Sequence, residues 1–216
     1  MKKGLTELVF ILDKSGSMSG LERDTIGGYN TMLEKQKAAE GECRITTVLF
    51  DNGYELLHDR IDIRAVDPIT DNEYAVGGST ALLDAVGRTI HKIGNVQKHT
   101  AEGYRAEKVL FVIITDGEEN ASREYSAEKV RAQIERQKEK YGWEFIFLGA
   151  NIDAVAAAGR FGISADRAQT YHADSQGVAL NFDAVGEAVS SFRMCAAVPE
   201  DWSDKIRKDY DKRTER

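Results

Sequence analysis

The hydrophobic positions of the chain form short unbroken runs separated by longer amphipathic stretches. Residues 8–12 and 107–115 are dominated by Val, Ile, Leu and Phe. Both runs are too short for typical helices and rich in strand-forming residues, so they predict strands that are buried on both faces. Residues 21–40 and 174–194 instead carry apolar residues at helical spacing, which predicts amphipathic helices. Alternating strands and helices predict a Rossmann-like, doubly wound α/β fold with a mostly parallel central sheet and helices on both faces.

The other segments fit the same pattern. The turn sequence Asp51-Asn52-Gly53 predicts a hairpin whose second strand is antiparallel and lies at an edge of the sheet. A further helix is expected after Thr80, followed by a polar surface connection over residues 93–104. The remaining predicted elements are strands at 142–148 and 167–172 and helices at 122–140 and 153–160.

Length and composition limit the classes of protein. The 216 residues suffice for one α/β domain with a sizeable core, and the net charge of −7 argues against nucleic acid or an anionic membrane as a general partner. The two cysteines, Cys43 and Cys195, lie far apart and form no CxxC spacing, so we expect buried thiols and not a disulfide framework. We find no signal peptide and no apolar run of membrane-spanning length, so we expect a cytoplasmic protein. Residues 1–198 are expected to form a single domain, and residues 199–216 a charged C-terminal tail that is either a solvated helix or frayed.

Oxygen-bearing side chains cluster where the first predicted strand ends. Asp13, Ser15 and Ser17 follow residues 8–12 directly, and the carboxyl ends of strands in an open α/β sheet are the usual ligand-binding position. Three such side chains within five residues suit a hard cation such as Mg²⁺. An equally good interpretation at this stage is that a serine caps the next helix and Asp13 forms a turn.

Two later segments add further oxygen atoms. Thr80 follows the glycine pair Gly77-Gly78 at the start of a predicted helix, where a simple helix cap is the first interpretation. Asp116 ends the second buried strand, as Asp13 ends the first. Because neighbouring central strands end side by side, Asp13 and Asp116 are expected to face one crevice that the Thr80 loop closes. Convergence of three segments is more specific evidence than any one of them.

Together the three segments resemble the metal-ion-dependent adhesion site (MIDAS) of von Willebrand factor type A (VWA) domains. The matching residues are Asp13-Lys14-Ser15-Gly16-Ser17, Thr80 in Gly77-Gly78-Ser79-Thr80, and Asp116 in Thr115-Asp116-Gly117. The order and spacing fit a complete site, and the resemblance extends over roughly residues 5–192. It is a resemblance to the compact, intracellular, bacterial-type VWA proteins.

The resemblance implies a metal-dependent protein-binding module, not an enzyme. By it, Ser15, Ser17 and Thr80 supply hydroxyl ligands to Mg²⁺ (or Mn²⁺ or Ca²⁺), and Asp13 and Asp116 act mainly through bound waters. An Asp or Glu side chain of a partner protein would fill the open coordination position. Similar proteins often act in multiprotein systems beside an AAA+ ATPase, a kinase or a phosphatase, so the resemblance allows such a partner without identifying it.

The alternative function is a Mg²⁺-dependent phosphoryl-transfer enzyme of the haloacid-dehalogenase type. Such enzymes need a second acid two residues after the nucleophile, and Ser15 occupies that position. Among the other candidates, Glu118 and Glu119 are interpreted mainly as solvating residues, and Asp84 either as support for the site or as a favourable charge near a helix start. The four histidines show no ligand spacing and are expected to lie singly on the surface.

Overall fold

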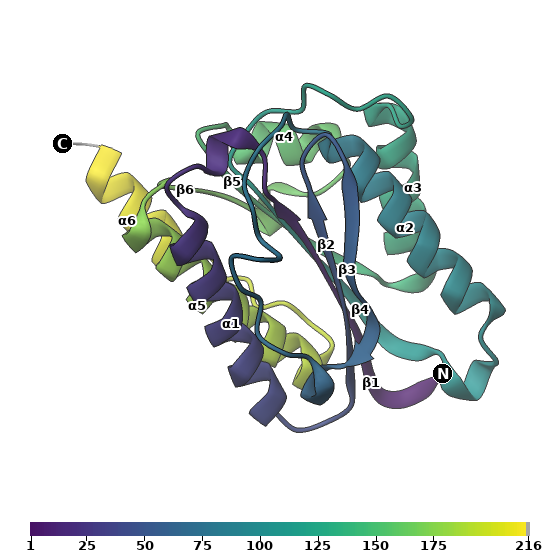
Figure 1. Cartoon of the computed structure of the whole chain (residues 1–216). Coiled ribbons are helices and arrows are strands. Elements are labelled where there is room, and N and C mark those ends of the chain that lie inside the picture. The colour runs from purple at the N-terminus through teal and green to yellow at the C-terminus, as the bar shows by residue number, and fades with distance from the viewer. Residues whose placement is uncertain (215–216) are drawn as a thin grey trace.

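The computed structural model describes residues 1–214 as a six-stranded sheet between two layers of helices (Figure 1). The strand order is β3-β2-β1-β4-β5-β6, and only β3 runs antiparallel, at one edge. This confirms the predicted fold class. The strands are β1 (Lys2–Asp13), β2 (Cys43–Phe50), β3 (Tyr54–Asp62), β4 (Ala106–Thr115), β5 (Glu144–Ala150) and β6 (Ala168–Tyr171). The α-helices are α1 (Glu22–Ala38), α2 (Leu82–His99), α3 (Ala127–Tyr141), α4 (Ala154–Arg160), α5 (Ser175–Cys195) and α6 (Asp204–Thr214).

The central strand β1 explains why the sheet is covered on both faces. Its side chains alternate between the two sides: Leu8, Phe10 and Leu12 belong to one apolar cluster, while Val9 and Ile11 belong to the other. The first cluster is completed by α1, α5 and the segment from Val198 to Ile206 in α6, and the second by α2, α3 and α4. Figure 1 shows the corresponding layers, with the purple α1 beside the yellow-green α5 on one face and the teal α2 and α3 on the other.

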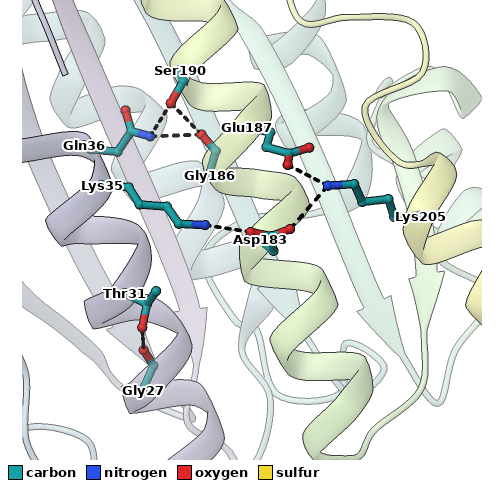
Figure 2. A network of polar contacts seen from close by, with 9 residues as sticks. All are labelled: Gly27, Thr31, Lys35, Gln36, Asp183, Gly186, Glu187, Ser190 and Lys205. Carbon is teal, nitrogen blue, oxygen red and sulfur yellow. Dashed lines mark hydrogen bonds and ion pairs between the residues drawn. The ribbon is translucent and has the colours of Figure 1, made fainter. Parts of the chain in front are cut away.

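Polar contacts fasten α1, α5 and α6 to one another (Figure 2). Lys35 Nζ of α1 lies 2.6 Å from an oxygen of Asp183 in α5, and Lys205 of α6 reaches the same carboxylate at 3.4 Å. Deeper in the interface, Gln36 Nε2 donates to the carbonyl of Gly186 at 2.9 Å and to Ser190 Oγ at 2.8 Å. The exposed ion pairs contribute little stability, whereas the buried amide fixes how α1 meets α5.

Two expected boundaries differ from the structure. Helix α2 continues to His99 instead of giving way to a surface connection at residue 93, because Ile93 extends the buried stripe by another turn. Helix α3 begins at Ala127 and not at residue 122, because Ser126 caps it and the preceding residues are held in a loop.

The expected charged tail is a helix over the part that the structure describes, as one of its two interpretations had it, but the helix is not wholly solvated. Helix α6 covers residues 204–214, and Trp202 and Ile206 are only 6% and 2% exposed within the core. The segment therefore packs on the core through Trp202 and Ile206, while most other side chains of α6 are exposed or half-buried. Within residues 1–214, none of the helices combines the length and hydrophobicity needed to cross a membrane.

Candidate metal centre

The sheet register brings the two acidic residues to the same edge. Strands β1 and β4 are parallel neighbours, and Leu12 pairs with Ile114. Asp13 and Thr115 therefore end adjacent strands, and Asp116 follows at once. Both carboxyl groups are about 1% exposed, so the chain places two acids in a poorly solvated position.

Asp13 is oriented by three groups around it. Its Oδ1 accepts the backbone N–H of Ser15 at 2.7 Å, and its Oδ2 accepts the hydroxyl of Thr115 at 2.6 Å. The phenol of Tyr74 donates to the Asp13 carbonyl oxygen. The expected turn role of Asp13 is thus present, but the carboxylate is also held by the neighbouring strand.

The three hydroxyl groups form a chain between the loops. Thr80 Oγ1 donates to Ser15 Oγ at 3.0 Å, and Ser15 Oγ lies 3.1 Å from Ser17 Oγ. Ser17 Oγ in turn donates to Asp116 Oδ1 at 2.5 Å. The structure therefore brings together all five residues that the sequence analysis proposed, from three separate segments.

The capping interpretation of these hydroxyls is not supported. Ser15 precedes the short 3₁₀ helix η1 (Gly16–Met18) but makes no side-chain cap bond there. Helices α1 and α2 start after Leu21 and Ala81, which make no side-chain cap bond, and the first N–H groups of α2 are accepted by Glu119 and Ser122 instead of by Thr80. Ser15, Ser17 and Thr80 thus direct their hydroxyls toward one another and toward Asp116.

Two glycines make the close approach of the loops possible. Gly78 has φ +75°, and a Cβ there would lie 2.2 Å from Asn52 Oδ1. A Cβ on Gly117 would lie 3.2 Å from Ser17 Oγ and 3.3 Å from the hydroxyl of Thr80. The space beside the hydroxyls is therefore kept free of side-chain atoms.

Asp116 carries an unused acceptor. Its Oδ2 is buried and has no hydrogen-bond partner within residues 1–214. Burial raises the pKa of Asp116 to about 6; the Ser17 hydrogen bond opposes this rise and the nearby Asp13 adds to it. Burial also raises the pKa of Asp13, against the hydrogen bonds from Ser15 and Thr115. Both acids are thus harder to ionise than usual. A positive charge nearby would stabilise their ionised forms.

The side chains that converge at this edge offer only oxygen atoms to a metal ion. Residues 1–214 contain no group of three or more His, Cys, Asp or Glu side chains placed to hold a metal. A cation at this edge must therefore be held partly by hydroxyls, and Ser15, Ser17 and Thr80 are the ones that converge. Oxygen ligands of this kind fit Mg²⁺, Mn²⁺ or Ca²⁺.

Several supporting residues were not identified from the sequence. Thr115 holds Asp13, and Asn120 Oδ1 accepts the N–H of Thr80 at 2.9 Å while the Asn120 N–H donates back to the Thr80 carbonyl at 3.0 Å. Their partners are far away in sequence, so spacing gives no signal for them. Only the position of Thr115 at the end of a buried strand, directly before Asp116, could have suggested its role.

The acidic residues beyond the site divide into two kinds. Glu118 is exposed, as expected. Glu119 is not a solvating residue: it accepts the backbone N–H groups of Leu83, Ala121 and Ser122 and the hydroxyl of Ser122. The loop after Asp116 is therefore fastened to the first turn of α2.

Asp84 fastens the same loop further on, through the backbone N–H groups of residues 123–125. Its role is thus to support the loop. His91 and His99 are exposed, as predicted, whereas His58 and His172 are partly buried.

Solved structures with the same architecture were found by comparison of the folds. A VWA protein from Catenulispora acidiphila superposes with a TM-score of 0.56 over 86% of this chain and 42% of its own, at 16% identity. The chain has the fold of a VWA domain. No family model matches the sequence, and a search of curated proteins gives no significant match.

Two other VWA-like neighbours were solved with metal. Proximal thread matrix protein 1 from the mussel byssus, with zinc in its MIDAS motif, has a TM-score of 0.59 at 14% identity over 86% of this chain and 46% of its own. The manganese-loaded TRAP protein of Plasmodium vivax has a TM-score of 0.53 at 19% identity over 69% and 58%. This chain thus spans less than two thirds of each of these three proteins.

Proposed function

We propose that this protein is a divalent-metal-dependent protein-binding module. The observation that carries the proposal is the chain of three hydroxyls that cap no helix and end on a buried carboxylate with one unused oxygen. A structural loop junction has no need to leave such an acceptor unpaired, because an unsatisfied buried polar atom costs free energy. A cation at this position would remove that cost and would offset the repulsion between the carboxylates of Asp13 and Asp116.

The division of work among the residues follows from their surroundings. Ser15, Ser17 and Thr80 would hold Mg²⁺, Mn²⁺ or Ca²⁺ through neutral hydroxyls, while Asp13 and Asp116 would act mainly through water. When bound, the ion supplies the positive charge that attracts a partner's carboxylate. Because the hydroxyl ligands do not neutralise the ion, an Asp or Glu of a partner protein is the complementary group. The metal-loaded VWA-fold structures support the metal class.

The kind of partner is the finer part of the proposal. We infer a protein of a multiprotein intracellular system, such as an AAA+ ATPase, a kinase or a phosphatase, that presents Asp or Glu to the metal. We do not propose phosphoryl transfer, because Ser15 stands where that chemistry needs a second acid, and its hydroxyl is already bonded to Thr80.

The test separates metal binding from partner capture. Titration with Mn²⁺, followed by the loss of the free-ion electron paramagnetic resonance signal, should show one site in the wild type and none in Asp13→Ala. Glu118→Ala is the matched control, because it removes a nearby exposed acid that is outside the site. Circular dichroism should show that both variants are folded.

Partner capture is tested in a lysate of the source cell. The wild type should retain a protein in Mg²⁺ and release it in EDTA, and Ser17→Ala or Thr80→Ala should weaken capture far more than stability. Unchanged Mn²⁺ affinity in Asp13→Ala would refute the metal site. A partner retained equally in EDTA would move the binding function to another surface.

A further inference from the structure

A polar cleft lies at the end of the sheet opposite to the metal centre. It is enclosed by the second halves of α2 and α3 and by the first residues of β4, and its volume is about 630 Å³. In Figure 1 this region is beside the N-terminus, where α2 ends. Met1 lines the cleft directly before β1 begins and Asp13 ends that strand, so the two sites are on the order of 30 Å apart. No part of the proposed metal function uses this cleft.

Two amide side chains in the cleft wall have unused hydrogen-bonding atoms. Gln97 of α2 and Gln133 of α3 both line the cleft, and Gln97 Nε2 and Gln133 Oε1 are buried without a partner within residues 1–214. Buried polar atoms are normally paired. Both side chains line the cleft, so a ligand that offers both an acceptor and a donor would pair with the two amides once they turn toward it.

The mouth of the cleft is positively charged although the whole chain carries −7. Lys98, Arg136 and Lys140 line it, and none of them forms an ion pair with a residue of the described range 1–214. The pKa of the Tyr141 phenol shows this charge. Desolvation raises that pKa, but Lys140 and Arg136 beside the phenol lower it further, and the net shift is downward. Glu107, one of the acids in the lining, already accepts the N–H of Gly4 at 2.7 Å. An anionic group is therefore favoured at this position.

The floor of the cleft is aromatic and apolar. Trp143 lies there at 5% exposure and stacks on Phe111, with ring centroids 5.5 Å apart and planes at 17°. Ile90 and Val109 line the same region. Such a surface suits a flat, partly apolar body better than an inorganic anion.

A glycine in the helical wall marks a close approach of α2 and α3 beside the cleft. Gly94 sits inside α2, where glycine is less favourable than alanine, and its position faces Gln137 across the cleft at 3.4 Å from an added Cβ. A larger residue at this position would occupy the space between the helices.

We propose that this cleft binds a mononucleotide. The phosphate would lie against Arg136 and Lys140, and the base would lie near Trp143 with its donor and acceptor edge toward Gln97 and Gln133. Arginine and lysine are well suited to phosphate, and a glutamine amide matches the paired donors and acceptors of a base. An acidic peptide would satisfy the charges but has no group that suits both the aromatic floor and the paired amides.

The experiment is calorimetric titration of the full chain, in EDTA, with AMP, GMP, CMP and UMP. At least one mononucleotide should bind with a dissociation constant below about 1 mM, which is a typical scale for a weak specific ligand. The matching nucleoside and inorganic phosphate should each bind at least tenfold more weakly. Quenching of tryptophan fluorescence provides a second readout, because Trp143 lines the cleft.

One variant removes the positive charge at the mouth of the cleft, and another fills part of the cleft. Arg136→Ala combined with Lys140→Ala should weaken binding at least tenfold, and Gly94→Leu should block it without loss of charge. Lys129→Ala is the matched control, since Lys129 is exposed on the same helix but outside the cleft. Asp13→Ala should bind the nucleotide as the wild type does, so failure here is distinct from failure of the metal proposal.

Four outcomes would overturn the proposal. These are no binding of any mononucleotide, equal binding of inorganic phosphate, unchanged affinity in the double variant, and binding of a glutamate octapeptide in place of nucleotides.

Discussion

The two acidic side chains at the metal centre are buried, although carboxylates are most stable in water. Asp13 and Asp116 are both buried, the charge of Asp13 raises the pKa of Asp116, and both acids raise the pKa of the Tyr74 phenol. Without a cation, this arrangement costs free energy whenever both carboxyl groups are ionised. The cost is concentrated at Asp116, because Oδ2 has no hydrogen-bond partner among residues 1–214.

Asp116→Asn should therefore change how the stability of the metal-free protein depends on pH. The folded-state pKa of Asp116 is about 6, against an ordinary value of 3.8, so between these values the folded state binds a proton that the unfolded state has lost. The contribution of Asp116 to the free energy of unfolding consequently falls as pH rises through this window. The free energy of unfolding of Asp116→Asn, taken relative to that of the wild type, should therefore rise by on the order of 2–3 kcal/mol from pH 4 to pH 7.

Urea unfolding in EDTA at the two pH values measures this difference. Glu118→Ala, which changes an exposed acid two residues away, should show no comparable gain. In excess Mg²⁺ the comparison should reverse, because the wild type is then stabilised by the ligand and the variant is not. An Asp116→Asn variant with the same pH dependence as the wild type would show that Asp116 is ionised without cost.

At the scale of elements, the position of α1 against α5 depends on one glycine. A Cβ on Gly28 would lie 2.3 Å from Cδ2 of Phe182 in α5, whereas a Cβ on the adjacent Gly27 would have nothing within 4 Å. Gly28→Ala should lower the free energy of unfolding by about 1–3 kcal/mol, because the buried Phe182 ring has to move. Gly27→Ala should raise it by about 0.5–1 kcal/mol through helix propensity alone.

Thermal or urea unfolding of the two variants tests the packing directly. The pair is well matched, since both changes add one methyl group to neighbouring positions of the same helix. Equal stabilisation by both substitutions would mean that α1 and α5 do not meet closely at this point.

The same elements show why the sequence predicted the fold well and some boundaries poorly. The runs that became β1 and β4 are apolar without interruption, because both faces of these strands are covered. Such short apolar runs are typical of buried strands and not of amphipathic helices. The end of α2 was misplaced because the buried Ile93 continues its apolar stripe by another turn, and the start of α3 because the Ser126 cap and contacts to the preceding loop set it. Glu119 and Asp84 hold the loop before α3 through backbone groups that any sequence would provide.

The metal centre divides in the same way. Asp13, Ser15, Ser17, Thr80 and Asp116 could be named from the sequence, because each stands at a strand end or loop that the fold class brings to one edge. Thr115, Tyr74 and Asn120 could not, since their contacts depend on the side-chain packing of segments 40 or more residues apart.

At the scale of the whole molecule, the C-terminal segment completes the core on the α1 and α5 face. Trp202 is buried and its Nε1 donates to the carbonyl of Asp166 at 2.8 Å, and Ile206 packs into the same cluster. On the outside, the Tyr210 ring stacks on His172 at 4.6 Å between centroids, and Arg213 pairs with Asp174 at the start of α5. The density of charge in this segment concealed a short apolar stripe.

Trp202→Ala should therefore destabilise the protein by about 3–5 kcal/mol, the usual cost of deleting a buried aromatic side chain. Lys208→Ala is the control from the same segment, because its side chain is 75% exposed and its change should stay within about 0.5 kcal/mol. Both values are measured by urea unfolding with a single cooperative transition. Near-zero effects for both variants would mean that the segment after residue 198 is a solvated appendage. A large effect for Trp202→Ala alone makes the segment that leads into α6 part of the folded unit, because only a packed segment transmits the loss of one side chain to the stability of the whole chain.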